Sequence, residues 1–108
     1  MPISGPTYDF NWSSVNNAPD KHGVYILYQA GKVIYIGRAT DPGVTLRSRL
    51  QAHKRGDLGK STKEAAAFQS EATDNPDTAA ARERQLLWDY QYLNGRPAWD
   101  YDPFLKFR

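Results

Sequence analysis

The sequence predicts an α+β domain, because it combines the pattern of a β-hairpin with segments of helical spacing. Two runs of β-branched and aromatic residues, 23–28 and 33–37, lie around a short glycine-containing turn, as in a hairpin. Later segments begin at capping residues and carry apolar residues three or four positions apart, which is typical of helices. A further β-prone segment, 67–73, lies between the helical ones and adds a third strand.

Length and composition indicate a single globular domain, 1–108. Of the 108 residues, 40% are hydrophobic and 24% charged, which excludes disordered, fibrous and membrane-spanning classes. No apolar run approaches the ~18 residues that cross a bilayer and no secretion signal begins the chain, so we expect a cytoplasmic protein without a membrane partner. Because cysteine is absent, a bound metal would have oxygen or histidine ligands, which favours a hard cation.

Both ends of the chain are predicted to pack on this domain. Residues 1–22 are rich in proline, asparagine, serine and aspartate, and they carry Tyr8, Phe10 and Trp12 at alternate positions. We interpret them as an N-terminal arm whose aromatic side chains contact the domain. Residues 97–108 are a second aromatic segment, and we expect this tail to pack back through Trp99, Tyr101, Phe104 and Phe107.

The turn sequence Gln29-Ala30-Gly31 sets the predicted register of the hairpin. A three-residue loop that ends in glycine at positive φ is a common connection, and here it places Tyr25 opposite Tyr35. Their side chains then leave the same face of the sheet, with β-carbons roughly 4.5–5.5 Å apart. This register assigns Val24, Ile26, Ile34 and Ile36 to one face and Tyr25, Leu27, Val33 and Tyr35 to the other.

A helix is predicted directly after the hairpin. It begins at a cap, Thr40 or Asp41, and continues to about Arg55. Arg49 and His53 are four residues apart on it and therefore share one helical face. We expect this face to meet the face of the sheet that carries the two tyrosines, and we expect Glu83 to reach that same face from the last helix.

Two further helices are predicted downstream. The segment Ser61-Thr62-Lys63-Glu64 has the pattern of a capping box and opens a short helix through Ala67. The last helix begins at the cap Asn75, with Pro76 in its first position, and runs to Asn94-Gly95.

Basic residues gather in the middle of the chain. The segment 38–64 holds seven basic and three acidic residues, a balance of +4, whereas the rest of the chain sums to −2. Such a segment suits a polyanion such as a nucleic-acid backbone, although a solvated helix face has the same composition. We expect contacts to nucleic acid from Arg47, Lys54, Arg55, Lys60 and Lys63.

Glu83 is the most informative single residue. It lies three and four positions before Leu86 and Leu87, on the predicted inward face of the last helix. A carboxylate at such a position needs a partner. That partner is either a cation, which would be Arg82, Arg84 or an arginine from another element, or a bound Mg²⁺.

Five further residues make up a set that suits phosphodiester hydrolysis. Each tyrosine alone would be an ordinary strand residue, and each cation alone an ordinary surface residue. Together with Glu83 they provide a base, charge stabilisers and a metal ligand, because guanidinium groups near a phenol favour its ionised form. The set consists of Tyr25, Tyr35, Arg38, Arg49 and His53.

These residues resemble the motifs of the GIY-YIG nuclease superfamily. Gly23-Val24-Tyr25 and Tyr35-Ile36-Gly37 are similar to its two name-giving motifs. The segment 46–53 resembles the helix in which the family has its arginine and, four residues later, its histidine. Glu83 falls in the late helix that carries the family's metal-binding glutamate, and Arg38 occupies a position where the incising subunit of bacterial excision repair has lysine.

The resemblance extends over about 23–100 and implies a fold and an activity. The implied fold is a three-stranded antiparallel sheet flanked by helices. The implied activity is that of an endonuclease that hydrolyses a phosphodiester bond in DNA, with Mg²⁺, or alternatively Mn²⁺, bound to Glu83. Arg38 and Arg49 would then neutralise the charge of the phosphate.

The two tyrosines have different expected roles in this reaction. Tyr25, assisted by His53, is the first choice for activating the attacking water. Tyr35 would form a hydrogen bond to the phosphate or the water, although the two tyrosines could exchange these roles.

The end of the chain departs from the family, and two other functions stay open. The family's usual terminal asparagine is replaced by Asp100, and Asn94 is a possible substitute. One alternative function is a module of the same fold that binds nucleic acid without cutting it, and the other is a protein-interaction domain that uses the aromatic tail. Specificity in this family usually comes from added domains, which leaves room for a protein partner that supplies it.

Overall fold

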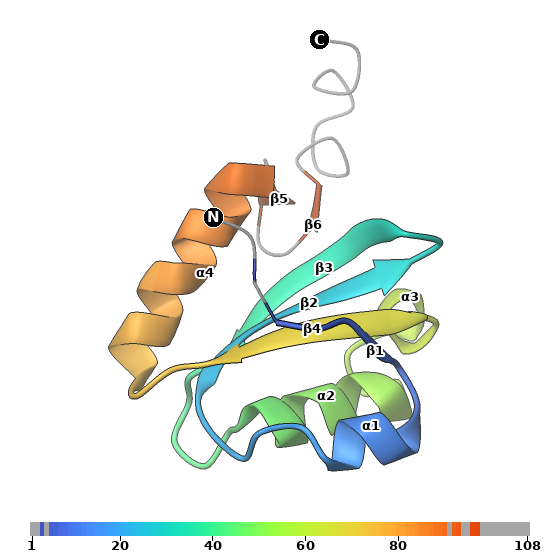
Figure 1. Cartoon of the computed structure of the whole chain (residues 1–108), viewed down its shortest axis with the longest axis horizontal. Helices are drawn as coiled ribbons and strands as arrows, with labels where there is room; N and C mark the ends of the chain where they lie inside the picture. Colours follow the sequence, from blue (N-terminus) through green and yellow to red (C-terminus); the bar gives the residue numbers. More distant parts are fainter. Residues whose placement is uncertain (1–2, 4, 91, 94–95, 98–108) are drawn as a thin grey trace, which may run out of the picture.

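The computed structural model describes residues 3, 5–90, 92–93 and 96–97, which contain a four-stranded antiparallel sheet (Figure 1). The strand order is β1-β4-β2-β3. The inner strands are β2, Gly23–Gln29, and β4, Ala67–Ala72, and the edges are β3, Lys32–Ala39, and β1, Tyr8–Asp9. The predicted α+β class and its three strands are confirmed, and the additional short strand comes from the N-terminal arm.

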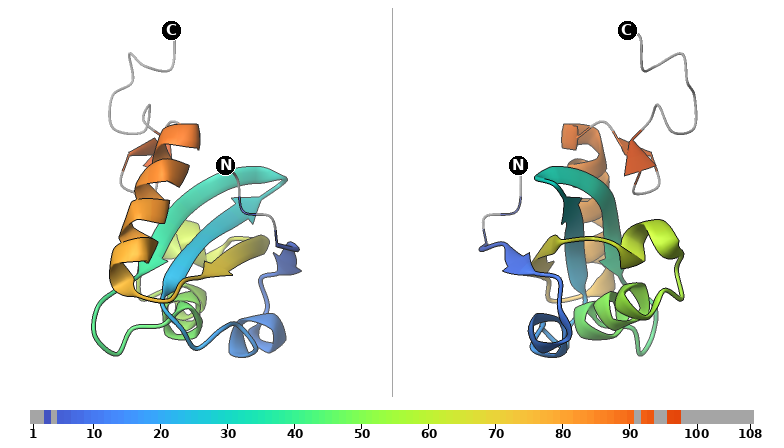
Figure 2. Two further views of the ribbon diagram at one scale, coloured as in Figure 1. Left: turned by 60° about the vertical axis from the view of Figure 1, so that its left-hand side comes forward. Right: turned by 90° about the vertical axis from the view of Figure 1, so that its right-hand side faces the viewer.

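Helices cover both faces of the sheet (Figure 2). On the face that carries Tyr25 lie α1, Trp12–Asn16, and α2, Leu46–Arg55. The short helix α3, Lys60–Lys63, follows α2 on the same side. The opposite face is covered by α4, Pro76–Tyr90. Each face of the sheet therefore has its own core.

The two cores follow the alternation of side chains along the strands. On the α2 side, the buried residues include Tyr25, Leu27, Leu46, Leu50 and Phe68. On the α4 side, they are Ile3, Val24, Ile26, Ile36 and Leu86. Full burial of one such aliphatic side chain contributes about 1.5–3 kcal/mol relative to exposure, so this alternation fixes which face each strand residue occupies.

The hairpin of β2 and β3 differs from the predicted register. Its turn has two residues, Ala30 and Gly31, with φ of 53° and 76°, because Gln29 already pairs with Lys32. Tyr25 therefore lies opposite Gly37, and the prediction that it pairs directly with Tyr35 is wrong. The pairing is shifted by two positions, and because side chains alternate, both tyrosines still project from the same face.

A β-bulge also exchanges two side chains between the faces. Leu27 pairs with Tyr35 and Tyr28 with Val33, so Ile34 is an extra residue in β3. Ile34 packs with the core on the α2 side and Val33 with the core on the α4 side, the reverse of the predicted faces. The error arises because a regular alternation cannot anticipate an inserted residue.

The predicted helices exist, but the beginnings of two of them are shifted. The segment from Asp41 to Val44 is a turn, closed by a hydrogen bond of 2.9 Å from the Val44 amide to the Asp41 carbonyl. The N-cap of α2 is consequently Thr45, which forms a capping box with Ser48, and not Thr40 or Asp41. α3 begins after Gly59 without a side-chain cap, so the capping box predicted at Ser61 does not form.

The last helix begins as predicted and ends early. The Asn75 side chain accepts a hydrogen bond of 2.8 Å from the Thr78 amide, which caps α4. The prediction that this helix runs to Asn94-Gly95 is wrong, because α4 ends at Tyr90 and the chain continues into a separate antiparallel pair of strands. These are β5, Tyr92–Leu93, and β6, Arg96–Pro97. No helix within the described ranges is long and apolar enough to cross a membrane.

The N-terminal arm is held mainly through one aromatic residue. Phe10 is buried, and its ring lies 6.1 Å from that of Phe68. Tyr8 pairs with Phe68 across β1 and β4 but stays half exposed, as does Trp12. The predicted packing of the C-terminal tail, together with Asn94 and Asp100, lies outside the residues that the structure describes.

Candidate active site

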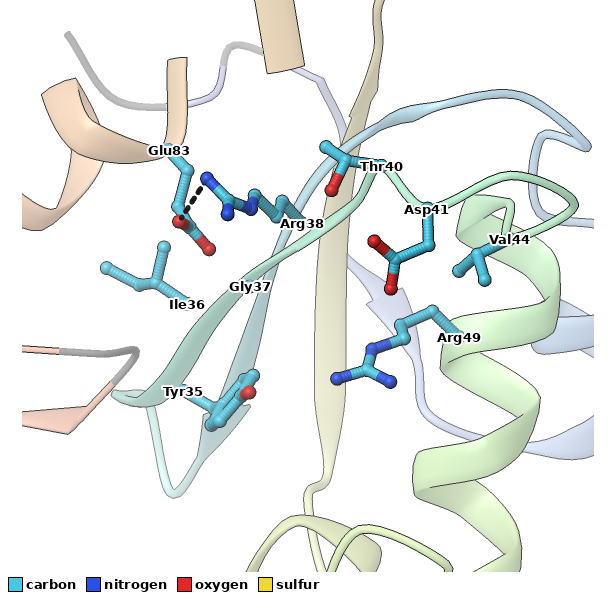
Figure 3. A pocket seen from close by; sticks show the side chains of 9 residues that line it. All are labelled: Tyr35, Ile36, Gly37, Arg38, Thr40, Asp41, Val44, Arg49 and Glu83. Atoms are coloured by element: carbon cyan, nitrogen blue, oxygen red, sulfur yellow. Dashed lines mark ion pairs between the residues drawn. The ribbon is translucent and has the colours of Figure 1, made fainter. Parts of the chain in front are cut away.

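A cavity of about 260 Å³ lies at the outer side of the edge strand β3 (Figure 3). Because β3 is an edge strand, side chains from both faces of the sheet reach this cavity. Tyr35 on β3 and Arg49 on α2 belong to one face, and Arg38 on β3 and Glu83 on α4 to the other. The prediction that Glu83 reaches the face of the tyrosines is therefore wrong, because α4 covers the opposite face and Glu83 meets the cavity at the edge of the sheet. The remaining lining residues are Ile36, Gly37, Thr40, Asp41 and Val44.

Gly37 is required by the packing of the two tyrosines. A β-carbon at this position would lie 2.5 Å from the Tyr25 hydroxyl oxygen and 2.8 Å from a ring carbon of Tyr35. No side chain can therefore replace the hydrogen of Gly37 without moving both phenols. Because Gly37 has no side chain, Tyr25, which lies opposite it on β2, can extend across β3 next to the cavity wall.

Tyr25 and His53 form a buried pair behind the cavity. The Tyr25 hydroxyl lies 2.7 Å from His53 Nε2, and His53 Nδ1 lies 2.8 Å from the Thr62 hydroxyl. Burial, with the nearby Tyr35, raises the pKa of Tyr25 far above its ordinary value, although Arg49 opposes this shift. Burial and the charge of Arg49 lower the pKa of His53 to about 4. Both side chains are therefore neutral at neutral pH.

Tyr35 occupies a different environment from Tyr25. It is half-buried and lines the cavity, whereas Tyr25 is completely buried and does not. The two rings stack at 6.1 Å with an interplanar angle of 23°, and the His53 ring packs edge-on against Tyr35 at 4.9 Å. Tyr35 is thus the phenol that a molecule in the cavity can contact.

Arg49 places its guanidinium group beside the cavity, with one N–H donor available to a ligand. Burial disfavours its charge, but the phenols of Tyr25 and Tyr35 interact with the guanidinium and raise its pKa. Its Nε is buried and has no hydrogen-bond partner. A buried donor without an acceptor costs about 1–3 kcal/mol, so such a group is typical of a site that receives an acceptor from a ligand.

Glu83 and Arg38 form the open side of the cavity. The Glu83 carboxylate lies 3.6 Å from Arg38 Nη1, with side chains that are 17% and 43% exposed. Burial raises the pKa of Glu83, while Arg38 and Arg84 counteract this shift. Of the cationic partners considered from the sequence, the structure pairs Glu83 with an arginine from another element, whereas Arg82 pairs with Glu71 at 2.8 Å.

The residues of the cavity fit a hard, largely hydrated cation. Glu83 supplies a half-buried oxygen donor, and Asp41 lines the same cavity. Within the described part of the chain, no group of three or more histidine, cysteine, aspartate or glutamate side chains could form a complete metal cage. Mg²⁺ keeps several water ligands and is usually bound by one or two carboxylates plus substrate phosphates, so a complete protein cage is not needed.

The five residues predicted to bind nucleic acid have different surroundings. Arg55, Lys60 and Lys63 line a separate cavity of about 490 Å³ at the end of α2 and along α3. Arg47 Nε donates to the Ala18 carbonyl at 2.9 Å, and Lys54 Nζ donates to the Phe10 carbonyl at 2.8 Å. Arg47 and Lys54 therefore hold the N-terminal segment in place, in addition to any contact with a ligand.

Two residues of this region were not predicted from the sequence. Thr62 had no visible link to His53, because the loop that joins α2 and α3 brings them together. Asp41 was one of two predicted helix caps, whereas in the structure its carboxylate points into the cavity toward Arg49 (Figure 3). Its position directly before Pro42-Gly43 is a signal for a turn that could have indicated this role.

Comparison with known proteins supports the interpretation of this cavity. No protein-family model and no curated protein sequence matches the chain. Among solved structures, the chain is similar to the GIY-YIG N-terminal endonuclease domain of UvrC from Thermotoga maritima, bound to its catalytic divalent cation, magnesium. The identity is 26%, the match covers 74% of this chain and 89% of that domain, and the TM-score is 0.61.

Two point mutants of the same domain, also bound to the catalytic divalent cation, are similar to the chain as well. Their identities are 25% and 26%, with TM-scores of 0.61 and 0.60, and each match covers 74% of this chain and 88% of that domain. The order of the strands and helices agrees with this likeness, and so does the packing of Gly37 against two tyrosines. The chain therefore has the fold of the GIY-YIG nuclease superfamily.

Proposed function

We propose that this protein is a metal-dependent endonuclease that hydrolyses a phosphodiester bond in nucleic acid, with DNA as the expected substrate and the cytoplasm as the expected location. One observation carries the proposal. Tyr35, Arg38, Arg49 and Glu83 come from three different elements and line one cavity. Such a cavity offers a phenol, two cations and a carboxylate to a single phosphate group.

The arginines would bind and polarise the scissile phosphate. Arg49 Nε is a buried donor without an acceptor, which a phosphate oxygen could supply. Arg38 is more exposed and is paired with Glu83 across the cavity. Guanidinium groups suit this task because they stay charged and donate in a fixed fork geometry.

Glu83 would hold the metal, for which we propose Mg²⁺, with Mn²⁺ as a possible substitute. When bound, this ion supplies Lewis-acid stabilisation of the charge that develops on the phosphate. The structural neighbour from Thermotoga maritima binds magnesium as its catalytic cation, which supports this choice. Burial and pairing with Arg38 hold the Glu83 carboxylate at the cavity in the absence of a ligand.

The geometry favours an exchange of the tyrosine roles first expected. Tyr25 is completely buried and its raised pKa disfavours the phenolate, so it is poorly placed to take a proton from water. Tyr35 lines the cavity and lies next to Arg49. We therefore assign contact with the attacking water or phosphate to Tyr35, and assign Tyr25 and His53 to the support of Tyr35 and Arg49.

More distant cations would guide the nucleic-acid backbone. Arg55, Lys60 and Lys63 already share one concave surface, and Arg47 and Lys54 add charge on α2. Each such contact adds electrostatic affinity that is independent of sequence and falls with salt. A protein partner that supplies specificity would be compatible with this non-specific mode of binding.

The decisive experiment is incubation of supercoiled plasmid with the purified protein and Mg²⁺, with a chelator control. We expect nicked or linear DNA with Mg²⁺ and none with the chelator. Retardation of the plasmid without cleavage, in either Mg²⁺ or Mn²⁺, would contradict the nuclease and support the module that only binds. Failure to bind DNA at low salt would instead favour the protein-interaction domain.

A further inference from the structure

A buried series of hydrogen bonds leads from α3 toward the cavity. The Thr62 hydroxyl is 3.4 Å from the Gly59 carbonyl and 2.8 Å from His53 Nδ1, and His53 Nε2 is 2.7 Å from the Tyr25 hydroxyl. Thr62 and His53 are each 1% exposed and Tyr25 is 0% exposed. Bulk water does not reach these groups, so each donor must find its acceptor within the protein.

Only one direction of hydrogen bonding satisfies all of these donors. If Thr62 donates to Gly59, its oxygen can accept from His53 Nδ1–H, and Nε2 is then free to accept from the Tyr25 hydroxyl. In the reverse direction Nε2–H would point at the Tyr25 oxygen, and the buried Tyr25 hydroxyl would lose its acceptor. The cost of an unpaired buried donor favours the first direction, with the proton on Nδ1.

This direction has a consequence for Arg49. The Tyr25 hydroxyl donates to His53, so its oxygen lone pairs remain for the Arg49 guanidinium, which interacts with both phenols. A rotation of the Tyr25 hydroxyl would turn a proton toward a cation. The orientation of Arg49 at the cavity therefore depends on the tautomer of His53.

We propose that Thr62 is a positioning residue that fixes the tautomer of His53 and, through Tyr25, the placement of Arg49 at the cavity. The role of Thr62 in catalysis rests on the proposed nuclease function, whereas its effect on the tautomer of His53 does not. Thr62 is suited to this task because its hydroxyl donates to the Gly59 carbonyl and its β-branched side chain has few rotamers. Its only contact with the reaction would be through His53 and Tyr25.

The first test is ¹⁵N NMR of the imidazole groups, in the absence of metal and nucleic acid. We expect the buried His53 to be neutral with its proton on Nδ1 in the wild-type protein and in Thr62→Ser, which keeps the hydroxyl. In Thr62→Val, which keeps the shape, we expect loss of that single tautomer. A wild-type proton on Nε2, or an unchanged tautomer in a folded Thr62→Val protein, would overturn the proposal. If Thr62→Val fails to fold, the wild-type and Thr62→Ser spectra still decide the direction.

The second test is cleavage by the same variants. For Thr62→Val we expect a fall in kcat on the order of tenfold to a hundredfold with little change in KM, because a displaced catalytic group lowers turnover more than binding. Thr62→Ser should recover most of the loss. Ile26→Val, in the other core, serves as a control for a matched loss of thermal stability and should keep its kcat.

The two tests separate the possible failures. A wild-type protein that shows the Nδ1–H tautomer but does not cut DNA would contradict the proposed function and leave the positioning of His53 intact. An active enzyme whose kcat is equally reduced by Thr62→Val and Ile26→Val would contradict the positioning role and leave the proposed function intact.

Discussion

The two sides of the cavity differ in how far water reaches them. On one side, Tyr25 and His53 are completely buried and uncharged, and their hydrogen bonds are short. On the other side, Arg38 and Glu83 are partly exposed, and their ion pair is longer, at 3.6 Å. The buried side has one arrangement that satisfies its donors, whereas the exposed side can exchange its partners for water or a ligand at little cost.

This difference suggests a division of tasks within one site. Groups in the buried side set geometry, since moving any of them leaves a polar atom without a partner. Groups in the exposed side bind the substrate and the cation, since their present pairing is easily replaced. Tyr35 and Arg49 lie between the two and belong to both, because each contacts the buried side and lines the cavity.

The largest expected effect is on the exposed side, at Glu83. Glu83→Gln should lower cleavage on the order of a thousandfold or more, because it removes the proposed metal ligand and keeps the shape of the side chain. Affinity for DNA in the presence of chelator, and thermal stability, should stay near the wild-type values. Undiminished plasmid cleavage by this variant would show that Glu83 only pairs with Arg38.

Arg49→Ala tests the group that joins the two sides. We expect kcat to fall by about a hundredfold or more, because a preorganised donor to the developing charge is lost. The measurement is single-turnover cleavage together with DNA affinity at several salt concentrations. A variant that cuts at the normal rate once bound, and shows only weaker affinity with a smaller salt slope, would make Arg49 a simple backbone contact.

The two tyrosines allow a direct comparison of the sides, since the same atom is removed from each. Tyr35→Phe should lower kcat on the order of a hundredfold and leave stability almost unchanged. Tyr25→Phe should lower stability by about 1–3 kcal/mol, because the buried His53 Nε2 loses its donor. Activity and urea unfolding of both variants would measure this. Equal effects of the two substitutions on stability would contradict the proposed division.

The last expected effect is absent at neutral pH and concerns protonation of the buried side. His53 has a folded pKa of about 4 and an ordinary value of 6.5, so the unfolded chain binds its proton first as the pH falls. Its contribution to stability is therefore fully present above about pH 6.5 and is lost progressively toward pH 4, by about 3 kcal/mol.

Urea unfolding between these pH values would test this prediction, with His53→Gln as the reference. The wild-type protein should lose more stability on acidification than the variant does. The difference in stability between the two proteins at each pH removes the contributions of other groups. One of these is Glu83, whose raised pKa makes the folded protein more stable as the pH falls. Parallel pH profiles for the two proteins would show that His53 is not held neutral by its surroundings.

Much of the fold was predictable because local patterns determine it. The hairpin, the four-residue spacing of Arg49 and His53, and the cap at Asn75 each depend on neighbouring residues alone. The shared face of the two tyrosines was predicted correctly although the register was wrong, because an error of two positions leaves each side chain on the same face. The bulge at Ile34 does not preserve the alternation, so Ile34 and Val33 were assigned to the wrong faces.

The parts of the site that the sequence could not predict depend on contacts between distant segments. Which tyrosine reaches the cavity depends on the close approach at Gly37, where the absence of a side chain admits Tyr25. The partner of Glu83 is Arg38, 45 positions earlier in the chain, because α4 crosses the end of β3. Such pairings follow from tertiary packing and leave no local signal.

The location of the cavity on an edge strand restricts how copies of this protein could assemble. An edge strand has unpaired backbone groups on which another chain can add a strand. Addition at β3 would cover the cavity and exclude a long, stiff ligand such as duplex DNA. At the other edge, β1 pairs with Phe68 and Ala67 of β4, and the N-terminal segment continues beside that strand, where Gln69 Nε2 donates to the Gly5 carbonyl at 2.7 Å. An assembly that extends the sheet and keeps the cavity open must therefore grow from the N-terminal edge.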